Sequence, residues 1–140
     1  MTVHKSFESL SRRIEQLGVD VVENSEDVAK RASFAALAGV VVATPVDEGT
    51  ARSNWNAGLG KPDLSTKLES QNSQPPEIID RGNARIKQYK ESINGIFISN
   101  NLNYIARLEN GHSGQAPRGM LRHGVAAARQ VIRKAKLLRR

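Results

Sequence analysis

The sequence predicts an α+β fold in which helices outnumber strands. Apolar residues recur at helical spacing near both ends of the chain, and short alternating segments between them indicate two or three strands. Because helices separate these strands, we expect a small antiparallel or mixed β-sheet flanked by N-terminal and C-terminal α-helices. A chain of 140 residues is the size of one domain, so we expect a single unit over 1–140.

The first third of the chain is predicted to be helical. Residues 5–23 carry apolar side chains at steps of three and four, on one stripe of an amphipathic helix. Asn24 or Ser25 can cap a second helix from about 26 to 43, which is rich in small residues. One long bent helix is the alternative. The apolar stripe consists of Phe7, Leu10, Ile14, Leu17 and Val21.

A tight connection is predicted after the N-terminal helices. Pro45 ends the helix, since proline cannot donate a backbone hydrogen bond. Asp47 can accept backbone N–H bonds from a following turn, and Gly49 can take a positive φ. Arg52 can pair with Asp47 or stack on Trp55. We expect Asp47 and Arg52 to fix the connection over residues 44–55.

The middle of the chain combines a strand, a loop and a helix. Residues 54–59 alternate between apolar and polar side chains, which predicts a strand with Trp55 inward. Residues 60–78 are polar and rich in proline and serine, so we expect a long flexible loop or arm. This loop either becomes ordered against a partner or is a surface loop without a specific role. Residues 78–93 resume helical character, with inward positions at Ala84, Ile86, Tyr89 and Ile93.

A strand, a short helix and a glycine-rich loop follow within residues 95–120. Ile96 and Ile98 alternate with their neighbours, which suits a strand. Asn100 or Asn101 can cap the short helix through its side-chain oxygen. We expect the helix to pack under the strand through Tyr104, Ile105 and Leu108. We expect the loop after the helix to be shaped by Gly111, Gly114 and Pro117.

The chain is predicted to close with a basic helix within 118–140. Its apolar stripe consists of Leu121, Val125, Ala128, Ile132 and Ala135. No acidic residue follows Glu109, whereas eight lysines or arginines do, and the net charge of +7 favours acidic partners. A solvated helix face is the simpler interpretation; a surface facing a partner or DNA is the other. The basic row consists of Arg122, Arg129, Arg133, Lys136 and Arg140.

No catalytic or metal-binding motif is present in the sequence. There is no cysteine, which excludes disulfides and thiolate metal sites. The three histidines are scattered, and neither an HExxH motif, a GxSxG elbow nor a P-loop occurs. A hydrolase using His112 is the weakest hypothesis. No apolar run reaches the ~18 residues of a membrane span. We therefore expect no enzyme activity, no cofactor, no metal and no membrane partner.

Three segments in order resemble the tail-completion, or neck, proteins of long-tailed bacteriophages. Thr44–Trp55 resembles the family's TPVDTGxxRxxW segment. Ile98–Gly111 resembles its ISNNxxYAxxLExG segment, including Tyr104, Glu109 and Gly111. His112–Met120 resembles its xSxQAPxGM loop, including Gln115 and Pro117. The likeness covers nearly the whole chain. Departures from the family pattern stand at Glu48, Asn103, Ile105 and Gly114.

The resemblance implies a non-enzymatic virion protein at the head–tail junction, made in the host bacterial cytoplasm. Such proteins form a ring, here expected to be a hexamer or dodecamer, through which DNA passes. The implied partners are other copies of the chain, head connector or head-closure proteins, and tail terminator or tail tube proteins. Non-specific contact with genomic DNA in the channel is also implied. A basic nucleic-acid-binding protein using the C-terminal helix is the alternative.

Overall fold

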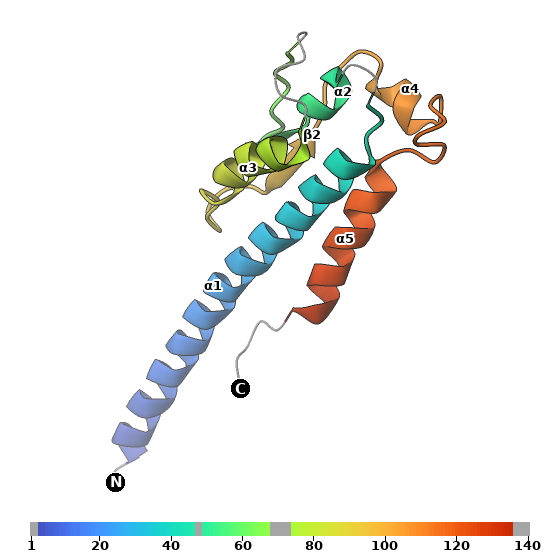
Figure 1. Ribbon diagram of the computed structural model, residues 1–140. Coiled ribbons are helices and arrows are strands. Elements are labelled where there is room, and N and C mark those ends of the chain that lie inside the picture. Colours follow the sequence, from blue (N-terminus) through green and yellow to red (C-terminus); the bar gives the residue numbers. More distant parts are fainter. Residues whose placement is uncertain (1–2, 47–48, 68–73, 136–140) are drawn as a thin grey trace.

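The fold is α+β and is dominated by one long N-terminal helix (Figure 1). The computed structural model describes residues 3–46, 49–67 and 74–135. Within those ranges a two-stranded sheet is surrounded by helices, as the sequence predicted. In chain order the elements are α1 (Val3–Ala43), α2 (Thr50–Ser53), β1 (Asn56–Leu59), α3 (Pro75–Ile86), β2 (Ile96–Ser99), α4 (Ile105–Glu109) and α5 (Leu121–Lys134).

Helix α1 is continuous, so the alternative of one long helix is correct and the predicted break near Asn24 is not. Asparagine and serine cost a helix interior only a few tenths of a kcal/mol each, which is too little to end a helix that is packed elsewhere. Glu26, close to the expected break, makes a tertiary contact: its Oε1 accepts the backbone N–H of Glu91 at 2.8 Å. This contact ties the turn after α3 to the middle of α1.

Helices α3 and α5 pack along the C-terminal half of α1 (Figure 1). Two glycines allow α1 and α5 to approach closely. A Cβ atom on Gly39 would lie 2.9 Å from the carbonyl oxygen of His123, and one on Gly124 would lie 2.9 Å from that of Ala36. The small residues of the C-terminal half of α1 therefore serve a helix–helix contact.

The sheet consists of β1 and β2 in antiparallel pairing, with Ala57 opposite Ile98 and Leu59 opposite Ile96. The first strand is shorter than predicted, because residues 50–53 form α2 and Trp55 precedes β1. Trp55 nevertheless points inward and is 3% exposed. A Cβ atom on Gly58 would overlap the carbonyl oxygen of Lys61, so the chain folds back tightly over β1.

The hydrophobic core lies between α1, the sheet, α3 and the loop before α5. Leu37 and Val41 of α1 are fully buried, as are Ile86 of α3 and Met120. The core is mainly aliphatic, in keeping with the low aromatic content. Its buried cluster comprises Leu37, Val40, Val41, Trp55, Ala57, Ile78, Ile86, Ala116 and Met120.

The polar stretch 60–78 does not form one loop throughout. Helix α3 begins at Pro75, where proline suits the first helical turn, and Ile78 is 1% exposed. Residues 61–67 are exposed but are anchored to the sheet. The Asn54 side chain donates to the Lys67 carbonyl at 2.7 Å and accepts the Lys67 N–H at 2.6 Å. Ser99 Oγ donates to the Asp63 carbonyl at 2.7 Å.

The predicted helix over 78–93 begins earlier and ends at Ile86. Of its four predicted inward residues, Ile86 is buried, Tyr89 and Ile93 are half-buried, and Ala84 is exposed. Ala84 lies on the exposed side of α3, and Tyr89 and Ile93 lie beyond its end. Turns rather than helix follow Ile86, with the Tyr89 N–H donating to the Ile86 carbonyl and the Ile93 N–H to that of Lys90.

The last helix runs from Leu121 to Lys134, inside the predicted range, but its predicted apolar stripe is buried only in part: Ala128 is half-buried, as is Ala135 just after the helix. Leu121, Val125 and Ile132 are 47%, 46% and 56% exposed. The face against α1 centres on Gly124, because only glycine permits the close helix contact. No helix in the described ranges is both long enough and apolar enough to cross a membrane.

Candidate functional site

The three segments that carry the family resemblance meet at one end of the molecule. This motif end comprises the C-terminal end of α1, helices α2 and α4, and the loop of residues 110–120 (Figure 1). Long-range hydrogen bonds join the segments. The side chains that make them are Gln115, Asn100 and Glu109, all of which the sequence analysis singled out. The motif end is therefore the candidate site.

Thr44 is the centre of the first segment. Its hydroxyl donates to the carbonyl of Val40 and accepts the indole N–H of Trp55 at 2.7 Å. Its carbonyl accepts from a guanidinium nitrogen of Arg52 at 3.3 Å. Thr44 is 2% exposed, so these contacts satisfy a buried polar group where α1 ends. Arg52 thus helps to hold the connection after α1, and its partner there is the Thr44 carbonyl.

The remaining predictions for this segment have mixed outcomes. Gly49 has φ of 81°, the positive value predicted for it. Pro45 follows the end of α1 and is buried. Asp47 lies outside the described residues, as does any pairing it makes with Arg52. The Arg52 Nε atom is buried without a hydrogen-bond partner, while the rest of the side chain lines a surface hollow.

Gln115 joins the third segment to the first. Its Oε1 accepts the backbone N–H of Val46 at 2.9 Å, and its Nε2 donates to the Val46 carbonyl at 3.4 Å. The amide side chain thus pairs with both polar groups of one backbone residue, as a neighbouring strand would. This pairing holds the loop of residues 110–120 against the end of α1.

Asn100 joins the second segment to the first, in a role that differs from the predicted helix cap. Its Nδ2 donates to the Ala51 carbonyl at 2.8 Å, and its Oδ1 accepts the N–H of Leu102 at 3.2 Å. Asn101 likewise donates to the Leu64 carbonyl at 3.1 Å. Helix α4 starts after Tyr104 without a side-chain cap, so neither asparagine caps it.

Residues of α4 pack as predicted except for one. Ile105 and Leu108 are partly buried against the core, whereas Tyr104 is 38% exposed. Tyr104 lines a second hollow at the motif end, together with Pro45, Gly49, His112 and Gln115. The tyrosine therefore belongs to the surface of the candidate site.

Glu109 connects α4 to the start of α5. Its Oε2 accepts the backbone N–H groups of Met120 and Leu121 at 2.7 and 3.1 Å. These are otherwise unpaired donors at a helix N-terminus, where a carboxylate is also favoured by the helix dipole. The loop geometry depends on Gly119, with φ of 80°, because a Cβ atom there would overlap the Glu109 carbonyl oxygen.

Gly111 and Pro117 close the loop before α5. Gly111 has φ of 88°, and a Cβ atom there would overlap the Pro117 carbonyl oxygen. The chain therefore crosses itself at this point, and only glycine fits. Pro117 itself is exposed and lines the first hollow with Arg52, Arg118, Arg122 and His123. That hollow is basic and would suit an acidic group of a partner.

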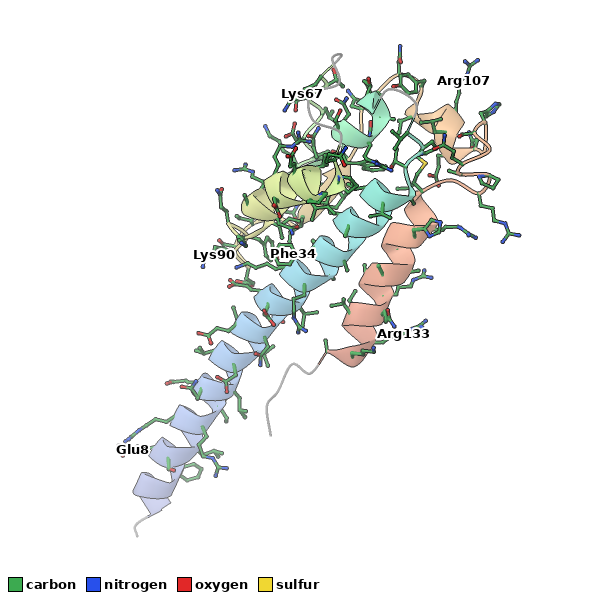
Figure 2. All side chains as sticks on the ribbon, in the orientation of Figure 1. Glu8, Phe34, Lys67, Lys90, Arg107 and Arg133 are labelled. Atoms are coloured by element: carbon green, nitrogen blue, oxygen red, sulfur yellow. The ribbon has the colours of Figure 1, made fainter. Side chains whose placement is uncertain are left out.

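The basic row on α5 is exposed where the structure describes it. Arg122, Arg129 and Arg133 are all exposed, and Figure 2 shows Arg133 on the side of α5 turned away from α1. Lys136 and Arg140 lie outside the described residues. The row continues from the basic hollow along α5, so these two cationic features form one surface.

The weakest hypothesis gave a catalytic role to His112. His112 is exposed in a loop beside Ser113. Among the described residues, no group of three or more histidine, aspartate or glutamate side chains could hold a metal ion. The motif end offers two open hollows, cationic side chains and a hydrogen-bonded scaffold. This arrangement suits the docking of another macromolecule.

Sequence reasoning missed several residues that build the site. Thr44 and Asn54 are buried polar residues whose side chains link segments, and Arg81 donates to the carbonyls of Ser53 and Trp55 at 2.7 and 3.2 Å. Isolated polar residues give no periodic signal, so only the fold shows their partners.

Comparison with protein-family models, curated proteins and solved structures gives no match for this chain.

Proposed function

We propose that this protein is a structural component of the head–tail junction of a long-tailed bacteriophage, of the tail-completion or neck type. In this role copies of the chain form a ring, a hexamer or dodecamer, that joins the head connector to the tail and lets DNA pass. The protein is made in the host cytoplasm and resides in the virion.

The observation that carries the proposal is the convergence of the three segments that resemble the family. The first segment lies far along the chain from the other two, which are consecutive in sequence, yet Gln115 pairs with Val46 and Asn100 with Ala51. Residues that resemble one family and also build one continuous scaffold are expected if they preserve a common docking end. A chance similarity at residues 44–55 would have no reason to contact the two segments at 98–120.

The chemistry of the motif end supports a docking role. Its side chains are used for hydrogen bonds to backbone groups, which fix shape, and its two hollows are open to solvent. The first hollow is lined by Arg52, Arg118 and Arg122, so an acidic face of a connector or tail protein is its expected partner. A structural ring subunit requires such surfaces and no reactive group.

Disruption of the gene in the phage that encodes the chain tests the role. We expect DNA-filled heads and separate tails, since the two halves of the particle would lack their joint. Supplying the wild-type gene in trans should restore joined particles. Supplying Arg122→Glu should restore fewer, because it reverses charge on the proposed docking face. Arg12→Glu, on the distant part of α1, is the matched control. Joined, infectious particles made without the protein would contradict the proposal.

A second candidate function, nucleic-acid binding, rests on α5. Its described residues include no acidic side chain, and Arg122, Arg129 and Arg133 are exposed along one row. Phosphate contacts would make DNA affinity fall steeply with salt. Fluorescence anisotropy with a random duplex at several salt concentrations separates the two functions. Tight, salt-sensitive binding that Arg129→Glu weakens would favour this second function, and binding no stronger than that of any basic protein would exclude it.

A further inference from the structure

The N-terminal half of α1 extends beyond the rest of the described structure. Figure 1 shows this projecting half, residues 3–24, continuing past the end of α5, and Figure 2 shows Glu8 on it with no other element alongside. At ~1.5 Å per residue it is about 30 Å long. Large apolar side chains on it are exposed: Phe7 by 64%, Leu10 by 51%, Ile14 by 60% and Leu17 by 50%.

These exposed side chains continue the face of α1 that α5 covers. Ile132 near the end of α5 and Ala135 just after it line a hollow with Ser25 and Val28 of α1. Beyond that point the same stripe runs on toward the N-terminus without cover from any described residue. A helix lying antiparallel on the stripe would therefore continue the line of α5.

The spacing of the stripe is that of a coiled-coil seam. Phe7, Ile14 and Val21 are seven residues apart, and Leu10 and Leu17 lie between them at steps of three and four. A seven-residue repeat keeps one face of a helix against a second helix along its whole length. The projecting half offers this face for about three repeats, ending at Asn24.

We propose that the projecting halves of two copies of this chain pair as an antiparallel two-helix coiled coil in the free protein. Ile14 of each copy packs on Leu17 of the other, and Leu10 packs on Val21. Phe7 then lies opposite Asn24 of the second copy, close to where its α5 ends. The inference concerns the free protein and does not rest on the proposed ring.

Charge fixes the register of this pair. Arg13 and Asp20 lie on the same flank of the stripe, each one residue before a seam position. In the proposed register, Arg13 of each copy faces Asp20 of the other, which gives two ion pairs. The Asp20 carboxylate is held on this flank, because its Oδ1 accepts from Gln16 Nε2 at 2.9 Å.

The alternative registers are less favourable. Sliding one helix by seven residues in one direction places Arg13 against Arg13, and sliding it in the other places Asp20 against Asp20. The second slide also brings Phe7 onto the part of α1 that α5 covers. A parallel pair would set Arg13 and Asp20 opposite Gly18 and Ser25, which carry no charge. Flanking charges are what select partner and orientation in coiled coils.

The pair leaves the proposed docking end free. Each α1 extends away from its own motif end, so an antiparallel overlap of the projecting halves places the two motif ends at opposite ends of the dimer (Figure 1). The contact is two-fold and self-complementary, and it therefore closes at two copies. It shields an apolar stripe that would otherwise face water.

Sedimentation equilibrium of the full-length protein over a range of concentrations tests the inference. We expect a monomer–dimer equilibrium for the wild type. Leu17→Glu should weaken dimerisation at least tenfold, whereas Val19→Glu should leave it unchanged, because Val19 is 49% exposed but lies off the stripe. A wild type that is monomeric at every concentration would overturn the inference. So would an assembly that Leu17→Glu does not weaken.

Charge reversal tests the register. Arg13→Asp should weaken the dimer at least tenfold, and Arg13→Asp combined with Asp20→Arg should restore it. Arg12→Asp, which lies off both flanks of the stripe, should have little effect. Unchanged helical circular dichroism confirms that each variant is folded. Failure of the double variant to restore dimerisation would overturn the antiparallel register. If the protein dimerises as proposed but is absent from purified virions, the function proposed above is refuted and the coiled-coil inference stands.

Discussion

The indole N–H of Trp55 donates to the hydroxyl oxygen of Thr44 across 2.7 Å in the protein interior. This bond joins the end of α1 to the chain just before β1, eleven residues later. Both side chains are almost fully buried, at 3% and 2% exposure. It therefore fixes the connection at the motif end more directly than any surface contact of that segment.

Replacing Trp55 by phenylalanine should lower the free energy of unfolding by about 1–2 kcal/mol. The change removes the indole donor and part of the buried ring. Thr44→Val removes the acceptor, together with the hydrogen bond that the Thr44 hydroxyl donates to the Val40 carbonyl. A double-mutant cycle with both substitutions, measured by urea denaturation, should give a coupling of ~0.5–1 kcal/mol. Strictly additive effects would show that the bond contributes nothing to stability.

Replacing Glu109 by alanine should lower the free energy of unfolding by about 1 kcal/mol. The carboxylate accepts two backbone N–H groups at the start of α5, and caps of this kind contribute about that much. Glu15→Ala, on the exposed projecting half, is the control and should change stability by less than ~0.5 kcal/mol. Equal melting temperatures for Glu109→Ala and the wild type would exclude the capping role.

Replacing Gly124 by alanine should lower the free energy of unfolding by at least ~1–3 kcal/mol. The new Cβ would lie 2.7 Å from Val40 Cγ1 and 2.9 Å from the Ala36 carbonyl oxygen, so α5 would have to move off α1. Gly18→Ala is the matched control and should stabilise by up to ~1 kcal/mol, since a Cβ atom on Gly18 would meet none of the described residues within 4 Å apart from the adjacent backbone of its own helix. Destabilisation of both variants alike would contradict the close contact.

Asp63 should make a small contribution to stability that depends on pH. The Ser65 hydroxyl and backbone N–H donate to its Oδ1 at 2.6 and 3.0 Å, and they hold the pKa of Asp63 below its ordinary value of 3.8. Because the folded pKa is the lower one, this stabilisation is present above pH ~4 and is lost as pH falls through the folded pKa.

The measurement compares urea denaturation of the wild type and Asp63→Asn at neutral pH and near pH 3. The wild type should lose more stability on acidification than the variant, by under about 1 kcal/mol, since the carboxylate is exposed to water. Ser65→Ala removes the strongest donor and should shrink the difference. Identical acid sensitivity of wild type and Asp63→Asn would rule out the contribution.

Much of the fold was predictable because it rests on periodicity. The stripe from Phe7 and the alternation at Ile96 and Ile98 predicted a helix and a strand at the correct places. The errors have a common origin in tertiary contacts. Packing overrode a weak capping signal at Asn24, and the glycine contact at Gly124 left Leu121 and Val125 of the predicted α5 stripe exposed.

The candidate site was predictable only in part. The resemblance singled out Gln115, Asn100 and Glu109, but not what they bind, since each pairs with backbone groups distant in sequence. Every residue has the same backbone groups, so the sequence does not mark which of them a side chain will contact. Thr44 and Asn54 escaped notice because their roles depend on which distant groups the fold brings near them: the Trp55 indole for Thr44 and the Lys67 backbone for Asn54.

Cryo-electron microscopy of the virions that carry this gene product tests the central claim most directly. Our account predicts density for a ring of six or twelve copies between the head connector and the tail. In that density, the motif end of residues 44–55 and 98–120 should contact a neighbouring protein. Purified, infectious virions that lack the chain at the junction, shown by the map and by mass spectrometry, would contradict it.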